Sequence, residues 1–410
     1  MPSAVLPFEI IALIIDIVGE NKDTNLLKEL ALVSHSCLQI CNKYLFATVK
    51  LCNLSPKKEF IELLENRPDI VQYIRKLTYI MAREFADEEH LLSPILSNFL
   101  RTISRLNRLT ITGFTSDWNT LDSSLKSAFL HLMHLPTINH IDLSNILNFP
   151  MSSLILSVNL HRLDLRFMMP HTEPLVEDGS PGIVQSEMPK IREFHTSDSA
   201  MLTRKLLLAK CPDGRPAFNF TDLRRLSMNL DSPDDEQNVR YLLQNATLLE
   251  KLHLSVEPDR SLVGLHDFLS SSASTLKDLY LRVYLYHEFF SLPLAGLCEE
   301  LEAMTGYNVL ETLSFEVEVE AWEEEPEAED IGSIIQKVEK VLIKPGWSAL
   351  RQVCFDFSVH TIAGEESDKL YKELQILPNE YLSHLPNLES IAFNYSVQPA
   401  GYYYTVKHEF

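Results

Sequence analysis

The chain has 410 residues, more than one ordinary globular core accommodates, so we expect several domains or an elongated repeat. Lys and Arg total 36 against 57 Asp and Glu, and the resulting net charge of −21 disfavours nucleic acid as a partner. Hydrophobic residues make up 45% of the chain, which indicates a folded protein and excludes a disordered one.

The first predicted helix has an apolar residue at almost every position. Between Leu6 and Val18 only Glu9 and Asp16 are polar or charged. A helix that is apolar on every side must be covered on every side. Thirteen residues are fewer than the roughly 20 that span a bilayer as a helix. Since so short a segment has little core of its own, we expect a partner chain to cover the second face of this helix.

Residues 1–52 are predicted to form a three-helix bundle. Gly19 is placed where a glycine would end the first helix. Leucines from Leu26 onward recur at helical spacing and predict a second helix. Ser36 and Gln39 have the spacing of a capping box, which predicts that the third helix starts at Ser36. Residues 47–51 have an extended pattern.

This segment resembles the F-box. The matching stretches are Leu6-Pro7-x-Glu9-Ile10, Leu13-Ile14-Ile15-Asp16, Leu30-Ala31-Leu32-Val33-Ser34 and Tyr44-Leu45-Phe46, within roughly residues 4 to 50. The resemblance implies that the bundle binds a Skp-family adaptor and, through it, a cullin. It also implies that seven residues pack in or around this contact: Leu6, Pro7, Ile10, Ile14, Val33, Leu38 and Leu45. The chain departs from the family at Cys37, where many members have Trp.

One short motif, apolar-x-x-apolar-x-apolar, recurs through the rest of the chain. Its ten clear copies occupy residues 106–111, 138–143, 160–165, 191–196, 223–228, 249–254, 276–281, 310–315, 350–355 and 388–393, with a weaker copy at 74–79. Each copy ends in the apolar–polar alternation of a strand. Helical patterns lie between copies, clearest at residues 121–132, 239–246 and 331–342. Strand, helix and strand form a right-handed crossover, so the copies predict parallel strands.

The motif resembles the leucine-rich repeat over roughly residues 70 to 396. The resemblance implies an α/β fold in which an irregular horseshoe, with a parallel sheet inside and helices outside, follows the F-box bundle over residues 53–410. Tyr402-Tyr403-Tyr404 is a candidate C-terminal cap. The copies depart from the family in their long spacing, and most lack the Asn or Cys expected shortly after the strand.

Strand residues between the apolar positions should face the concave side, because side chains alternate along a strand. Their mixture of charged, His and Tyr side chains suits recognition of a substrate protein. The predicted surface includes Arg108, His140, Asp142, Arg162, Asp164, Arg166, Arg225, His253, Tyr280 and Arg282.

Four polar segments between motif copies are predicted to be loops or turns. They are residues 170–189, 231–238, 316–330 and 362–369. The third contains nine acidic residues and no basic one. Binding of a basic partner is one interpretation of this run, and we favour the other, a solvated loop that keeps the protein soluble.

No motif combines a nucleophile, a base and an oxyanion donor, and no glycine-rich phosphate loop is present, so we expect neither catalysis nor a cofactor. His131, His134 and His140 have no carboxylate or Cys at ligand spacing, and we expect no metal site. The six cysteines have no zinc or disulfide spacing and indicate free thiols. With no basic leader and no apolar run of membrane-spanning length, a cytoplasmic or nuclear protein without membrane contact is expected.

Two functional hypotheses follow. The leading one is a substrate-recognition adaptor of a Skp–cullin–F-box ubiquitin ligase, which docks through the F-box and binds a substrate protein on the repeats. The alternative is a leucine-rich-repeat scaffold whose N-terminal helices only cap the solenoid. The exposure of the first helix distinguishes the two hypotheses, because a cap buries its apolar helix whereas an adaptor-binding helix stays exposed.

Overall fold

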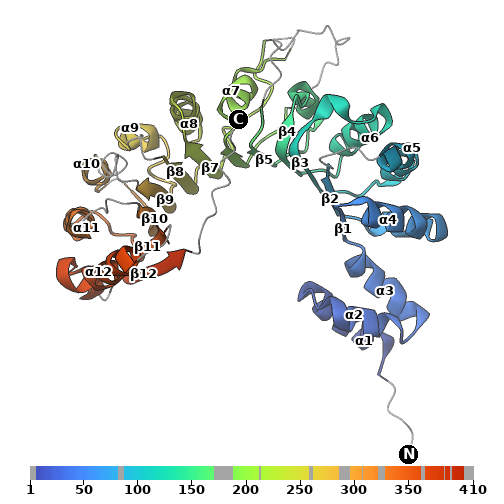
Figure 1. Cartoon of the computed structure of the whole chain (residues 1–410), viewed down its shortest axis with the longest axis horizontal. Helices are drawn as coiled ribbons and strands as arrows, with labels where there is room; N and C mark the ends of the chain where they lie inside the picture. The colour runs from blue at the N-terminus through green and yellow to red at the C-terminus, as the bar shows by residue number, and fades with distance from the viewer. Residues whose placement is uncertain are drawn as a thin grey trace, which may run out of the picture. The chain divides into compact units, whose positions relative to one another are not determined.

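The computed structural model describes residues 6–81, 87–169, 188–211, 214–257, 262–285, 296–306, 308–321, 328–361, 365–382, 384–387 and 390–400 (Figure 1). These residues form a mixed α/β fold with a parallel sheet of twelve strands in chain order. The chain divides into two compact units. The first contains Met1–Lys190 and Lys205–Phe218, and the second contains Ile191–Arg204 and Asn219–Phe410.

The first unit begins with three helices. They are α1 (Phe8–Glu20), α2 (Thr24–Ala31) and α3 (His35–Leu45). Their own core is small and consists of four buried residues: Ile15, Leu27, Cys37 and Cys41. The three predicted helices are therefore present, and the two cysteines serve as packing residues.

The predicted start of the third helix was wrong by two residues. Ser34, and not Ser36, is the N-cap, because its side chain accepts a hydrogen bond from the Cys37 backbone N–H at 3.1 Å. Ser34 has the extended backbone of an N-cap residue, with φ −161° and ψ 162°. Ser36 lies inside the first turn and is exposed.

Gly19 does not end the first helix as predicted, since α1 continues to Glu20. A Cβ atom at Gly19 would lie 2.4 Å from Cγ of Tyr44 in α3. The Tyr44 hydroxyl donates to Oδ1 of Asp16 at 3.1 Å, and Lys43 Nζ lies 2.7 Å from the same oxygen. The glycine therefore permits the close approach of α1 and α3.

The remainder of the first unit alternates strands with helices. The elements are β1 (Thr48–Leu51), α4 (Leu54–Asn66), η1 (Pro68–Tyr73), β2 (Lys76–Ile80), α5 (Asp87–Thr102), β3 (Arg108–Asp117), η2 (Trp118–Thr120), α6 (Ser123–Met133), β4 (His140–Leu147), η3 (Met151–Leu156) and β5 (Arg162–Arg166). Each strand pairs in parallel with the next. The predicted domain boundary after residue 52 falls between β1 and α4.

The following elements continue the alternation. They are β6 (Glu193–Ser197), α7 (Ala200–Leu208), β7 (Arg225–Leu230), α8 (Pro233–Asn245), β8 (Lys251–Val256), α9 (Leu265–Leu269), β9 (Asp278–Leu285), α10 (Leu297–Ala303), β10 (Thr312–Ala321), α11 (Ala328–Leu342), β11 (Gln352–Thr361), α12 (Glu365–Tyr381), η5 (Leu385–Asn387) and β12 (Ala392–Ala400). Neighbouring strands from β6 to β12 are parallel.

The sequence motif marks the strands correctly. Its ten clear copies fall at β3 to β12, and the weaker copy falls at β2. In most copies the last two residues of the motif are buried, as Leu163 and Leu165 are in β5. The helices predicted between copies are confirmed as α6, α8 and α11. In each unit the described helices that alternate with strands lie along one face of the sheet (Figure 1). We call the opposite side the helix-free face.

Three of the predicted loops were wrong in part. Residues 231–238 include the start of α8, which Ser232 caps and whose first turn carries three acidic residues that favour a helix N-terminus. Residues 316–330 include the end of β10 and the start of α11, because Val317 and Val319 alternate with glutamates as strand residues do. Residues 362–369 include the start of α12.

Parts of two other predictions lie outside the described residues. These are positions 170–187 of the predicted loop at 170–189, and the candidate cap at Tyr402–Tyr404. Within the described ranges, no helix has the length and apolar character needed to cross a membrane.

Candidate interaction surfaces

Helix α1 presents two apolar stripes. The inner stripe packs in the bundle and contains Ile11, Ile15 and Val18. The outer stripe, whose side chains are between 41% and 55% exposed, contains Ile10, Leu13, Ile14 and Ile17. Its spacing of i, i+3, i+4 and i+7 places the four side chains on one helix face. Such a face is typical of helices that bind in an apolar groove.

Other large apolar side chains of the bundle are also exposed. Leu6 and Phe8 stand at the start of α1, and Leu32 and Val33 stand between α2 and α3, where they are 88% and 68% exposed. A bundle of this size that exposes so many apolar side chains has a surface composition typical of an interaction site.

The structure divides the seven predicted adaptor-contact residues into two groups. Leu6, Pro7, Ile10, Ile14 and Val33 are exposed. Leu38 and Leu45 are partly buried, and Leu45 packs against the bundle core. Cys37, where the sequence departs from the F-box pattern, is buried in that core. Sequence reasoning left out Leu13 and Ile17, although their helical spacing from Ile10 and Ile14 predicts the same face.

A row of basic residues crosses the helix-free face of the first unit. Lys76, Arg108, His140 and Arg162 occupy the same register position in β2, β3, β4 and β5, so each is the direct neighbour of the next. We call these four residues the basic row. Since side chains alternate along each strand, residues two positions further on face the same way.

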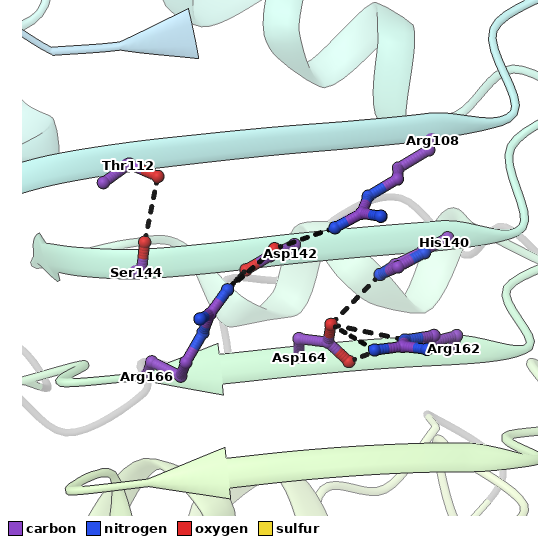
Figure 2. Close-up of polar contacts among 8 residues, drawn as sticks. All are labelled: Arg108, Thr112, His140, Asp142, Ser144, Arg162, Asp164 and Arg166. Atoms are coloured by element: carbon purple, nitrogen blue, oxygen red, sulfur yellow. Dashed lines mark hydrogen bonds and ion pairs between the residues drawn. The ribbon is translucent and has the colours of Figure 1, made fainter. Parts of the chain in front are cut away.

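Two buried carboxylates lie beside the basic row (Figure 2). Asp142 accepts hydrogen bonds from Arg166 Nη2 at 2.9 Å and from Arg108 Nη2 at 3.3 Å. Asp164 accepts two from the guanidinium of Arg162, through Nε and Nη2, each at 3.1 Å. Nε2 of His140 also lies 3.1 Å from Asp164. Six of the predicted substrate-binding residues are therefore brought together here.

The two carboxylates hold the arginine side chains in place through hydrogen bonds. Asp142 and Asp164 are almost fully buried, whereas the side chains of Arg108, Arg162 and Arg166 remain between 35% and 50% exposed. Ligand atoms of His140, Asp142 and Asp164 lie within 4.8 Å of one another, a separation compatible with a metal ion. Three guanidinium groups bonded to the two carboxylates disfavour a divalent cation, because they already neutralise both carboxylates.

The other four predicted residues lie in the second unit. The rings of His253 and Tyr280 meet edge to face with centroids 4.2 Å apart. Arg282 pairs with Glu318 and lies over the ring of Tyr284, and Arg225 pairs with Glu193 at 3.3 Å. Burial, with a smaller contribution from the positive charge of Arg282, lowers the pKa of His253 to about 4.

The two helix-free faces carry opposite charge. The register of β3 against β4 shifts between Thr112 and Ser116, and the charges are counted up to that point. There the helix-free face of β1–β5 carries two carboxylates and five cationic residues: Lys50, Lys76, Arg108, Arg162 and Arg166. On the face of β6–β12, the described side chains include three cations, Arg225, Lys251 and Arg282. Five carboxylates lie on that same face: Glu193, Asp278, Glu316, Glu318 and Asp356. Charge is therefore segregated between the units.

A scan against protein-family models finds no model that matches the chain, and a search of the curated proteins finds no similar sequence.

Proposed function

We propose that this protein is the substrate-recognition adaptor of a Skp–cullin–F-box ubiquitin ligase. Helices α1–α3 are the proposed F-box, and the strands and helices that follow are the proposed leucine-rich-repeat horseshoe. The bundle would bind a Skp-family adaptor and, through it, a cullin, while the repeats hold a substrate protein. Binding both raises the local concentration of substrate near the transferring enzyme and requires no catalysis by this chain.

The observation that carries this proposal is the outer stripe of α1. Full burial of an aliphatic side chain contributes roughly 1.5–3 kcal/mol relative to full exposure, so half of that remains to be gained at each of the four residues. A partner with an apolar groove would gain most of this free energy on binding. The F-box resemblance supplies the identity of the partner, because it matches the same segment.

Exposure also argues against the alternative, in which the bundle only caps the repeats. A cap gives stability by burying apolar surface against the repeat beside it. The bundle meets the rest of the first unit chiefly through α3 against η1, and the outer stripe of α1 is left exposed. An apolar stripe that lies outside the bundle core and stays between 41% and 55% exposed fits a docking helix better than a cap.

Co-purification with a Skp-family adaptor tests the proposal. The full chain should retain the adaptor, and Leu13→Asp/Ile17→Asp should reduce retention to background, because two charges would enter an apolar contact. The matched control is Ile95→Asp/Ile376→Asp. It makes the same change at two exposed isoleucines of α5 and α12 and should bind like the unchanged chain.

Two outcomes would contradict the docking role. One is failure of the folded, unchanged chain to retain any of several Skp-family adaptors. The other is an equal loss of binding in the control variant. Circular dichroism and the melting temperature of each variant show whether it is folded.

A further inference from the structure

We propose that the helix-free face of the first unit binds an acidic segment of a partner protein, one that carries several Asp or Glu side chains. The inference deepens the proposed function, since the segment would belong to the substrate protein. It concerns a site in β1–β5 and is testable on this chain without an adaptor.

The basic row has the dimensions of a short extended peptide. It crosses three inter-strand spacings of about 4.8 Å, which gives a length of about 14 Å. An extended segment rises about 3.3 Å per residue, so about five residues cover the row. Lys50 and Arg166 add positive charge on either side, at β1 and β5. Cationic groups spread over several strands match several carboxylates better than one compact phosphate.

The arginine side chains on this face are already ordered by ion pairs before any ligand binds. Asp142 fixes the guanidinium groups of Arg108 and Arg166, and Asp164 fixes that of Arg162. A guanidinium has five N–H donors, and the contacts of Arg108 and Arg166 to Asp142 use only their Nη2 nitrogens. Because each side chain is already ordered, binding loses less conformational entropy than it would with free arginines.

The charge of this face, compared with that of the whole chain, favours a short acidic segment as the ligand. Five cations against two carboxylates leave an excess of positive charge on this face, within a chain whose net charge is −21. A long polyanion such as nucleic acid would be repelled by the chain as a whole. A short acidic segment meets mainly the local field, since charges beyond about 10 Å are screened at 0.1 M salt. The helix-free face of the second unit has more carboxylates than cations among its described side chains and would repel an acidic segment.

Fluorescence anisotropy with labelled peptides tests this inference on the full chain. The first probe is a peptide of alternating Ser and Glu, about ten residues long. The second probe has Gln in place of every Glu, and the third is the Gln peptide with a single phosphoserine. The Glu peptide should bind, the Gln peptide should not, and binding of the Glu peptide should weaken as salt is raised.

Charge reversal at two lysines locates the site. Lys50→Glu/Lys76→Glu leaves every arginine contact to Asp142 and Asp164 in place, so no buried carboxylate loses its partner. This variant should bind the Glu peptide about tenfold or more weakly. The control, Arg225→Glu/Lys251→Glu, makes the same charge change on the face of the second unit, where it also removes the ion pairs to Glu193 and Asp278, and should leave the affinity for the Glu peptide unchanged in the folded chain.

Three results would overturn the inference. They are the absence of Glu-peptide binding by the folded chain at low salt, an equal loss of binding in both variants, and binding of the phosphoserine peptide alone. None of them bears on retention of the Skp-family adaptor, so this inference and the docking role can fail separately.

Discussion

Asp142 in β4 and Arg166 in β5 form an ion pair with one buried and one exposed partner. A single guanidinium nitrogen of Arg166 donates to both carboxylate oxygens of Asp142, each at 2.9 Å. Asp142 is 1% exposed, whereas the side chain of Arg166 is 50% exposed. The pair places a positive group at the surface over a carboxylate that water cannot reach.

Removal of the Arg166 guanidinium should destabilise the first unit. In Arg166→Gln, Asp142 would keep only its longer contact to Arg108, at 3.3 Å. We expect the free energy of unfolding in urea to fall by about 1–3 kcal/mol, because a buried charge would be less well paired. Adding Asp142→Asn to Arg166→Gln should recover part of this loss. No recovery in the double variant would show that the two residues are not coupled.

The N-cap of α3 gives a second prediction, with a matched pair of serines. Ser34→Ala should lower the stability of the bundle by about 1 kcal/mol, because the Cys37 N–H loses its acceptor. Ser36→Ala, two residues later in the same helix, should change it little. Urea unfolding followed by circular dichroism at the helical band measures both. A larger effect at Ser36 would mean that the cap is wrongly assigned.

Asp231 gives a prediction about pH. Burial, and then repulsion from Asp198 and Glu257, raises the pKa of Asp231 to about 7 from 3.8. At a pH between these two pKa values, the Asp231 carboxyl is ionised in the unfolded chain but still protonated in the folded chain. Asp231 therefore lowers the stability of the folded chain as pH rises from about 4 to 7. Above pH 7 the cost is complete.

Replacement of Asp231 by Asn should remove that cost. Asp231→Asn should raise stability at pH 8 by about 1–2 kcal/mol, after allowance for solvent screening, and should have little effect near pH 4. The melting temperature measured across this range gives the comparison. Equal effects of Asp231→Asn at pH 4 and pH 8 would contradict the assignment.

Several features could be read from sequence because they depend on local periodicity. Alternation around Leu163 and Leu165 places their side chains on one face of β5 and those of Asp164 and Arg166 on the other, whatever the neighbouring strands are. The helical spacing of Leu125, Phe129 and Leu132 predicts α6 in the same way. The prediction of a loop at residues 316–321, in contrast, was wrong because it relied on the acidic charge, whereas the alternation of Glu and Val there indicates a strand.

Other features depend on contacts between residues far apart in the chain. Gly19 has the sequence context of a helix end, yet its role comes from the ring of Tyr44, which only the packing of α1 against α3 brings near. The capping residue of α3, in contrast, was decided by local backbone conformation, since Ser34 is extended and Ser36, the same residue type, lies in the first helical turn.

The sequence by itself determined where β2 to β12 lie, three of the helices between them and which strand side chains leave the apolar core, because alternation and helical period are properties of the local backbone. Only the tertiary structure decided that the outer stripe of α1 stays exposed and that Asp142 lies between Arg108 and Arg166. Parallel pairing joins positions 24 and 34 residues apart in the chain, and the register of β3, β4 and β5 fixes which charges meet.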